Sequence, residues 1–132
     1  MKNNERELEN NVCFWQKLDT IWLSSHFVLD KAKGQSHAFY KNLVYPVDYG
    51  YLADSMGTDG KPINAYMGSK GDTQIEAIIV TCDILNKDCV VKVLIGCTQK
   101  DMEIILKFVN STEFQKAILI RRGDESPAWA GY

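Results

Sequence analysis

The sequence predicts an α+β domain that is mainly β, with a small antiparallel β-barrel flanked by helices. Two observations predict this class. Short runs of β-branched residues are separated by tight turns rich in Gly, Asp and Asn. Helical periodicity, in contrast, appears in only two stretches, one early and one late in the chain. With 132 residues there is room for one core, so we expect a single domain over residues 1–132.

The two predicted helices begin where charge and capping favour a helix start. The early helix covers residues 5–19, where apolar side chains share one face and three glutamates crowd the first turn, which the helix dipole favours. The late helix follows Thr98, a good N-cap, and carries Asp101 in its first turn. Its apolar residues recur at helical spacing: Met102, Ile105, Leu106 and Val109.

Five short runs are predicted to be strands. Residues 26–30 and 36–40 would form one hairpin, and a second hairpin would join two longer β-branched runs through the turn at residues 83–88. The strand runs are 26–30, 36–40, 75–82, 90–97 and 117–120, the loops are 54–60 and 68–72, and the tail after Gly123 is expected to be loose.

Composition gives no indication of nucleic acid or membrane as a partner. The formal net charge is -2, and the one basic pair, Arg121 and Arg122, is interpreted as a strand end. No stretch approaches the roughly 18 apolar residues that a membrane span needs, and no signal-type segment follows the N-terminus.

The four cysteines form no C-x-x-C pair. Cys82, Cys89 and Cys97 lie in or beside β-like runs, where a buried reduced thiol acts as a small apolar residue, and Cys13 lies in the early helix. A disulfide or metal role is the less favoured alternative. We therefore expect a cytoplasmic protein.

Two neighbouring blocks carry most of the functional information. Residues 45–51 read YPVDYGY, and residues 59–64 read DGKPIN. Together they resemble the YPxNYG and DGDPxD segments of the soluble, Mg²⁺-dependent inorganic pyrophosphatases, and the resemblance covers roughly residues 26–97. It implies a small OB-like barrel, hydrolysis of diphosphate to two phosphates, Mg²⁺ as cofactor and assembly into a homo-oligomer.

The resemblance also implies three metal-binding, catalytic aspartates. Asp59 follows residues 45–51, the tyrosine block, while Asp83 and Asp88 are five residues apart at the two ends of a predicted hairpin turn. These three aspartates match metal ligands of the family in residue type and order, and Asp83 and Asp88 also match in spacing. Carboxylate oxygens are ligands that Mg²⁺ prefers. The alternative is that all three are turn residues, since Asp favours turns through its own backbone hydrogen bonds.

Other residues match positions that bind phosphate in the family. Tyr45 and Tyr49 match tyrosines whose phenols can donate to phosphate, with ordinary packing as the alternative. His37 falls near the position of a phosphate-binding arginine. Lys92 is two residues beyond the position of a family phosphate-binding lysine, which Val90 holds in this chain. It shares a strand face with Asp88 and could still reach inward, but a plain solvated lysine is the favoured interpretation.

The sequence departs from the family pattern at two aspartates, which are replaced by Lys61 and Asn64. An ammonium in place of a carboxylate repels Mg²⁺ by several kcal/mol, on the order of what Coulomb's law gives at about 4 Å. We therefore expect weak or partial Mg²⁺ occupancy and weak or lost hydrolysis. The alternative function is a non-catalytic phosphate- or diphosphate-binding homologue in which Lys61 replaces a metal ion.

Overall fold

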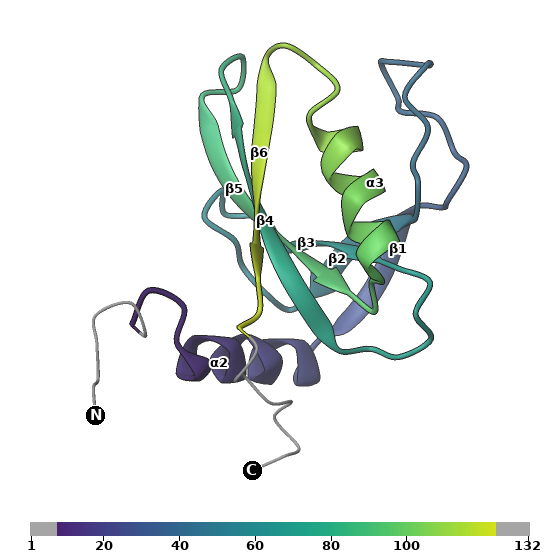
Figure 1. Ribbon diagram of the computed structural model, residues 1–132. Helices are drawn as coiled ribbons and strands as arrows, with labels where there is room; N and C mark the ends of the chain where they lie inside the picture. Colours follow the sequence, from purple (N-terminus) through teal and green to yellow (C-terminus); the bar gives the residue numbers. More distant parts are fainter. Residues whose placement is uncertain (1–7, 124–132) are drawn as a thin grey trace.

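The computed structural model describes residues 8–123, which form one six-stranded sheet and two helices (Figure 1). The sheet has the strand order β1-β2-β3-β5-β4-β6. Residues 5–7 of the first predicted helix and the tail after Gly123 lie outside the described residues. The elements are α2 (Val12–Leu23), β1 (His26–Lys31), β2 (Asp48–Ala53), β3 (Asn64–Met67), β4 (Ile75–Asp83), β5 (Asp88–Ile95), α3 (Gln99–Val109) and β6 (Gln115–Arg121).

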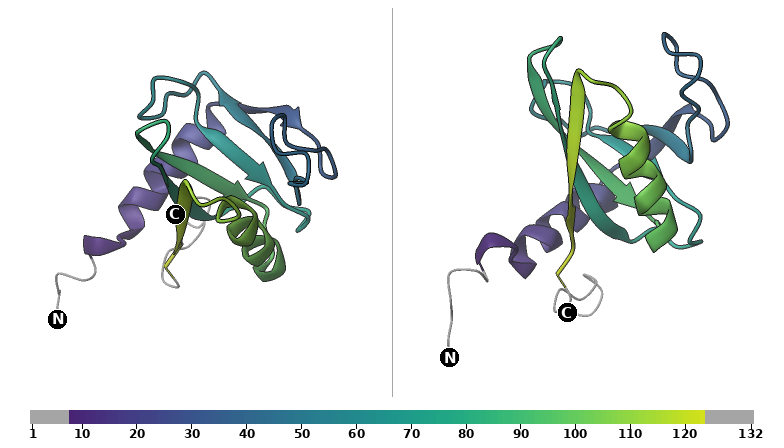
Figure 2. Two further views of the ribbon diagram at one scale, coloured as in Figure 1. Left: turned by 90° about the horizontal axis from the view of Figure 1, so that it is seen from above. Right: turned by 45° about the horizontal axis from the view of Figure 1, so that its top comes forward.

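The mainly β, α+β class is confirmed, but the strand pairing departs from an antiparallel barrel. The sheet is strongly twisted and open, with β1 and β6 at its two edges (Figures 1 and 2). Four of the five pairings are antiparallel, while β3 and β5 run parallel. β2 overlaps the first of the two sequence blocks, residues 45–51, and β3 begins at Asn64, the last residue of the second block. The turn residues of these blocks hide the strand character of both segments.

The predicted hairpin of residues 26–30 with 36–40 is wrong. β1 pairs with β2 instead, and the segment between them is a long loop. In that loop only Ser36 and Val44 form an isolated β-bridge, and a backbone hydrogen bond of 2.9 Å joins the Gly34 amide to the Tyr45 carbonyl. The loop therefore folds back on itself and returns the chain beside β1.

The two helices cover opposite faces of the sheet (Figure 2). Because side chains alternate along a strand, neighbouring residues of one strand belong to different core clusters. On one face Trp15 of α2 packs among residues that include Ile78, and on the other Ile105 of α3 packs among residues that include Ile79. α3 begins as predicted, with a capping box between Thr98 and Asp101, whereas α2 begins only at Val12, after Asn11.

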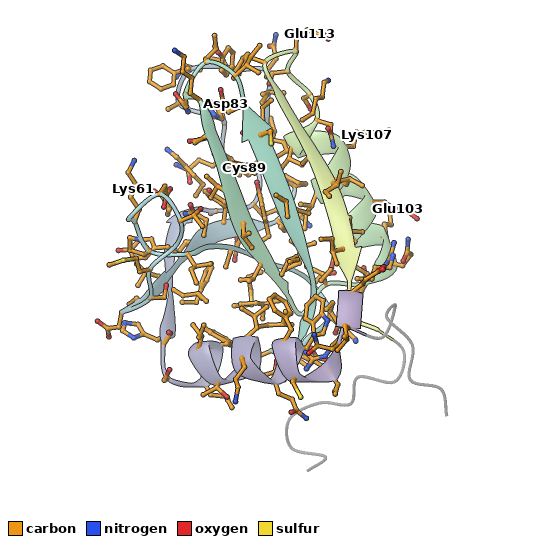
Figure 3. The ribbon with its side chains drawn as sticks, turned by 90° about the vertical axis from the view of Figure 1, so that its left-hand side faces the viewer. Lys61, Asp83, Cys89, Glu103, Lys107 and Glu113 are labelled. Carbon is orange, nitrogen blue, oxygen red and sulfur yellow. The ribbon has the colours of Figure 1, made fainter. Side chains whose placement is uncertain are left out.

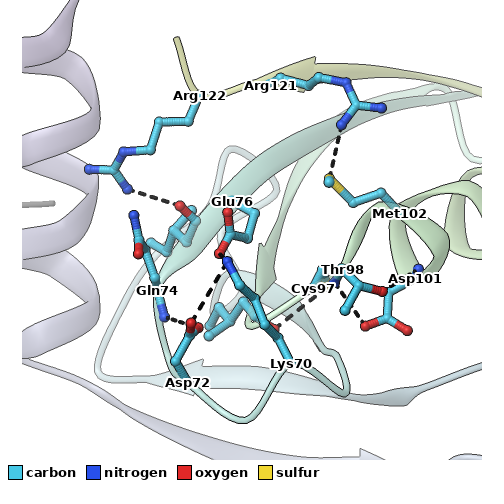
Figure 4. A network of polar contacts seen from close by, with 12 residues as sticks. Lys70, Asp72, Gln74, Glu76, Cys97, Thr98, Asp101, Met102, Arg121 and Arg122 are labelled. Carbon is cyan, nitrogen blue, oxygen red and sulfur yellow. Dashed lines mark hydrogen bonds and ion pairs between the residues drawn. The ribbon is translucent and has the colours of Figure 1, made fainter. Parts of the chain in front are cut away.

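Polar contacts fix the end of the sheet where α2 and the loop before β4 meet (Figure 4). The Lys70 ammonium lies 2.7 Å from the Glu76 carboxylate. Arg122 donates to the Asp19 carboxylate of α2 at 3.1 Å and to the Ile75 carbonyl at 2.9 Å. Since both ionic side chains of the Arg122–Asp19 pair are largely buried, this contact joins α2 to the end of β6.

Within residues 8–123, no helix is long and apolar enough to cross a membrane.

Gly50 of the tyrosine block is required by the close approach of β1 and β2. A Cβ at this position would lie 2.0 Å from the Val28 carbonyl oxygen and 2.9 Å from the Phe27 ring. The obstacle is backbone that is itself paired in the sheet, so it cannot move aside cheaply. Gly50 therefore sets the distance between β1 and the strand that carries Tyr49.

We predict that Gly50→Ala lowers the free energy of unfolding by about 3 kcal/mol, among the larger single-residue effects, because the clash is with backbone. Urea denaturation followed by circular dichroism measures the change. Gly57→Ala is the control, since its Cβ would meet nothing nearer than 3.4 Å. Equal stability of the two variants would contradict this account of the β1–β2 contact.

Candidate functional site

The hairpin of β4 and β5 places two of the predicted aspartates opposite each other. Asp83 ends β4 and pairs directly with Asp88, the first residue of β5. The Asp83 carboxylate also organises the turn between them. Its Oδ1 accepts from the amides of Leu85 and Asn86 at 2.8 and 3.0 Å, and its Oδ2 accepts from the Asn86 side chain at 3.3 Å. Asp83 therefore acts as a turn residue while it faces the site.

A polar recess of about 130 Å³ lies on the α3 face at this end of the sheet. Asp59 reaches it from the loop between β2 and β3, and its Oδ1 accepts from the Lys61 amide at 3.0 Å. Asn64 of β3 and Lys92 of β5 are register partners and lie side by side in it. The structure thus brings all three predicted aspartates around one recess, whose lining is Asp59, Asn64, Thr81, Asp83, Asn86, Asp88, Val90, Lys92 and Gln115.

A larger cleft of about 400 Å³ adjoins the recess and shares Asp83, Asn86, Lys92 and Gln115 with it. It lies between the β4–β5 hairpin, the end of α3 and the loop before β2, and Figure 3 shows the side chains around this end of the sheet. One part of its wall is made of Tyr45, Tyr49 and Tyr66, and another part is mainly apolar, with Leu, Val and Phe side chains. Its remaining lining residues are His37, Phe39, Tyr40, Leu43, Tyr45, Tyr49, Tyr66, Leu85, Phe108, Val109, Thr112 and Phe114.

Lys92 lines both the recess and the cleft, so the favoured interpretation of a plain solvated lysine is wrong. Its ammonium lies 5.1 Å from the centre of the Tyr49 ring. Burial lowers the pKa of Lys92, while the three nearby aspartates oppose that shift. Among the ion pairs of the described residues, none within 4.0 Å involves Lys92. The ammonium therefore faces the site without a direct carboxylate partner.

Three tyrosine hydroxyls add neutral donors to the cleft. The rings of Tyr45 and Tyr49 stack at 5.4 Å, and Tyr49 contacts Tyr66 at 4.7 Å. Burial raises the pKa of Tyr45 to about 12 and also raises the pKa of Tyr49 and Tyr66, so all three phenols keep their protons at neutral pH. Within residues 8–123, none of these hydroxyls makes a hydrogen bond to the protein.

His37 also lies at the cleft, but its ring already holds the loop. Its Nδ1 accepts from the amides of Phe39 and Tyr40 at 3.1 and 3.3 Å, and its ring stacks on Tyr45. Burial, together with the positive charges of Lys31 and Lys92, lowers the pKa of His37, which favours its neutral form. His37 could therefore offer its other nitrogen to a ligand without adding a cation.

Lys61 lies apart from these groups, exposed on the loop between β2 and β3 (Figure 3). It lines neither the recess nor the cleft. Its contact with the site is the backbone hydrogen bond to Asp59. A role for the Lys61 ammonium in ligand binding stays a prediction.

The residues of the recess fit a site for several Mg²⁺ ions poorly. Asp83 already accepts three hydrogen bonds from its turn, and the Lys92 ammonium points at the same space. Asn64 supplies an amide where the family resemblance would place a carboxylate. In the part of the chain that the structure describes, no group of three or more His, Cys, Asp or Glu side chains is close enough to hold a metal ion.

Comparison with solved structures identifies the fold. An inorganic pyrophosphatase from Helicobacter pylori aligns with a TM-score of 0.51 and 16% identity, over 77% of this chain and 78% of that one. The chain has a pyrophosphatase-like fold. An inorganic pyrophosphatase from Coxiella burnetii (TM-score 0.48, 16% identity, 77% and 79% coverage) and an inorganic phosphatase from Anaplasma phagocytophilum (TM-score 0.47, 14% identity, 74% and 74% coverage) also align. No protein-family model and no curated protein sequence matches this chain.

Within this pyrophosphatase-like fold, sequence reasoning missed several residues of the site. Tyr66 is the clearest case, since it is directly opposite Tyr49 in the β2–β3 pair. It is two residues from Asn64, so period-two alternation would have placed it on the site face if β3 had been recognised. Asn86 and Gln115, in contrast, come from turn and strand-end positions that carry no pattern.

We predict that at most one Mg²⁺ binds, with a dissociation constant on the order of 1 mM, because few free carboxylate oxygens face the recess and a lysine shares it. Titration calorimetry with Mg²⁺ and Mn²⁺ measures this. Asp88→Asn should remove the remaining heat, whereas Asp54→Asn, a change at an exposed loop aspartate, should leave it unaltered. Two or more ions bound with micromolar affinity would contradict the conclusion that the recess has too few free carboxylate oxygens for several Mg²⁺ ions.

Proposed function

We propose that this chain binds a small molecule carrying phosphate or diphosphate in the cleft, and that its hydrolysis of inorganic diphosphate is weak or lost. One observation carries the proposal. Four hydrogen-bond donors without an acceptor in the described protein line one cleft: the Lys92 ammonium and the hydroxyls of Tyr45, Tyr49 and Tyr66. A phosphate group offers many acceptor oxygens and no obligatory donor, so it complements this set.

The side chains that carry these donors are withdrawn from solvent to different degrees. Tyr66 is almost fully buried, and Tyr49 and Lys92 are partly buried. The donor atoms themselves keep some contact with water, because the Gln16 amide nitrogen is the one fully buried side-chain N or O atom of the described residues that lacks a hydrogen-bond partner. An acceptor-rich ligand would therefore replace water at these donors, and the hydrogen bond to the charged Lys92 would contribute most.

The carboxylates favour a ligand position toward the tyrosines. Asp59 and Asp88 line the recess and not the larger cleft, whereas the tyrosines line the cleft and not the recess. Lys92 lies in both linings. A phosphate between Lys92 and the tyrosines would therefore avoid the strongest repulsion from the aspartates, which falls with distance.

The pyrophosphatase-like fold also supports the enzymatic alternative, in which Asp59, Asp83 and Asp88 hold Mg²⁺ that activates water. The carboxylates that the resemblance would place at positions 61 and 64 are absent from this chain, which argues for weak turnover. Assembly into a homo-oligomer and a cytoplasmic location remain expectations from the family resemblance and the composition.

We predict that inorganic phosphate and diphosphate bind in excess EDTA, because the donors belong to the protein. Lys92→Ala should weaken binding by about 10- to 100-fold, as expected for the loss of a charge-assisted hydrogen bond. Calorimetry at low and high salt measures the affinity, which should fall as salt screens the ammonium. Tyr49→Phe should have a smaller effect in the same direction.

Lys61→Ala is the matched control, since this lysine is exposed and outside both linings. If Lys61→Ala lowers the affinity for phosphate and Lys92→Ala does not, then Lys61 and not Lys92 is the cation that binds phosphate. Phosphate release from diphosphate with Mg²⁺, measured with malachite green, tests the enzymatic alternative. Turnover at a rate typical of enzymes, about 1 s⁻¹ or more, would overturn the proposal of weak or lost hydrolysis.

The aromatic part of the cleft favours a second candidate ligand, a phosphate ester of a planar organic group. The rings of Tyr40 and Phe114 contact each other at 5.7 Å, and Phe108 contacts Tyr45 at 4.9 Å. The cavity of about 400 Å³ lies within the range of roughly 300–1,000 Å³ found for organic ligands. Such walls can stack a base or a similar ring while the phosphate meets Lys92.

We predict that a nucleoside monophosphate binds more tightly than inorganic phosphate. Tyr40→Ala should remove this advantage. Because stacking of a base is worth about 1 kcal/mol or more, the affinity for the nucleotide should fall by about 5-fold or more. Competition calorimetry measures both affinities. Phe14→Ala, at an exposed aromatic residue of α2, is the control. A nucleotide that binds no better than phosphate would exclude the ester and leave phosphate binding intact.

A further inference from the structure

Two cysteines face each other across the hairpin that carries Asp83 and Asp88. Cys82 of β4 and Cys89 of β5 are direct register partners in the antiparallel pair. Their sulfur atoms lie 3.4 Å apart, with one thiol donating to the other. The prediction that these β-strand cysteines are buried apolar residues is wrong for both, since each is exposed.

The dithiol lies on the sheet face opposite the candidate site. Side chains alternate along each strand, so Cys82 and Cys89 point away from the face of their neighbours Asp83 and Asp88. On the dithiol's own face, α2 packs further along the strands, through a cluster that includes Ile78 and Val93. A small oxidant can therefore reach both sulfur atoms without entering the cleft.

Strand geometry permits a bond between the two sulfurs at the cost of some strain. Directly opposed residues of an antiparallel pair have Cα atoms about 4.5 or 5.5 Å apart, and both values lie within the disulfide range. Their Cβ atoms are about 4.5–5.5 Å apart, however, while a relaxed disulfide prefers about 3.8 Å. A bond here draws the two strands closer, and a strained disulfide is more easily reduced.

We propose that Cys82 and Cys89 are a reversible modification site that forms an intramolecular disulfide with a low-molecular-weight disulfide as oxidant. One cysteine thiolate attacks a sulfur of the small disulfide, which forms a mixed disulfide and releases one small thiolate. The second cysteine thiolate attacks the cysteine sulfur of that mixed disulfide and releases the other. Two protein thiols are thus oxidised, one small disulfide is reduced to two thiols, and the cysteine protons pass to the released thiolates.

The other two cysteines differ from this pair. Cys97 is buried, and its thiol faces the Ile95 carbonyl at 3.6 Å. Cys13 is exposed on α2, and no contact between it and another cysteine is present in the described residues. The chain therefore provides its own comparison between an exposed single thiol and an exposed pair. This inference does not depend on what the cleft binds.

The test is oxidation of the full chain in mixtures of glutathione and glutathione disulfide, followed by acid quenching, alkylation with N-ethylmaleimide and mass spectrometry. We expect two alkylation sites to disappear together, with a mass loss of two hydrogen atoms and a peptide that links Cys82 to Cys89. Cys13→Ser should show the same transition. Cys82→Ser should instead leave Cys89 free or joined to glutathione, and reduction should restore the alkylation sites.

Three outcomes would overturn the proposal. The first is a protein that keeps all alkylation sites at glutathione ratios that oxidise an accessible dithiol. The second is stable glutathione adducts on both cysteines, and the third is a disulfide between two chains, which non-reducing electrophoresis detects. Because the serine variants change exposed side chains, we expect them to fold as the unaltered chain does. Circular dichroism tests this.

Discussion

The register of β4 against β5 is the constraint on which the candidate site depends. It places Asp83 opposite Asp88, and Ile79 opposite Lys92, all on the face that α3 covers. A slip of one residue would move each of these side chains to the other face. The same register brings the two sulfur atoms together on the far side, so both proposed chemistries rest on one pattern of backbone hydrogen bonds.

Sequence reasoning succeeded where the information is local. The turn at residues 83–88 and the helix after Thr98 follow from spacing, capping and β-branched runs, and the structure has both within about two residues. It failed for β2 and β3, because these short strands lie in or directly after segments with turn residues, and each has a partner, β1 or β5, that is distant in the chain. The parallel pairing of β3 with β5 joins Asn64 to Lys92, and no local pattern indicates such a contact.

The site residues divide in the same way. The three aspartates were expected at the site from the family resemblance, alternation allowed Lys92 to join them, and the structure gathers all four around one recess. Of the four donors on which the proposed function rests, Tyr45, Tyr49 and Lys92 were candidates from the sequence and Tyr66 was not. Their lack of acceptors could not be predicted, because it is a property of the packed protein. Lys61 is a different case, since a residue chosen for its position in a motif lies exposed on its loop and its role in ligand binding stays a prediction. A motif gives residue order, while the direction of each side chain depends on the turn around it.

The parallel pairing of β3 with β5 has a consequence for the way in which binding and folding are coupled. Tyr49, Tyr66 and Lys92 come from β2, β3 and β5, and only this non-local pairing connects the first two strands to the third. No single hairpin of the chain contains all three groups, so a partly folded sheet lacks the complete set of donors. A ligand that needs them all binds the native state alone, so by mass action it stabilises the whole sheet by an amount that rises with the logarithm of its concentration above the dissociation constant.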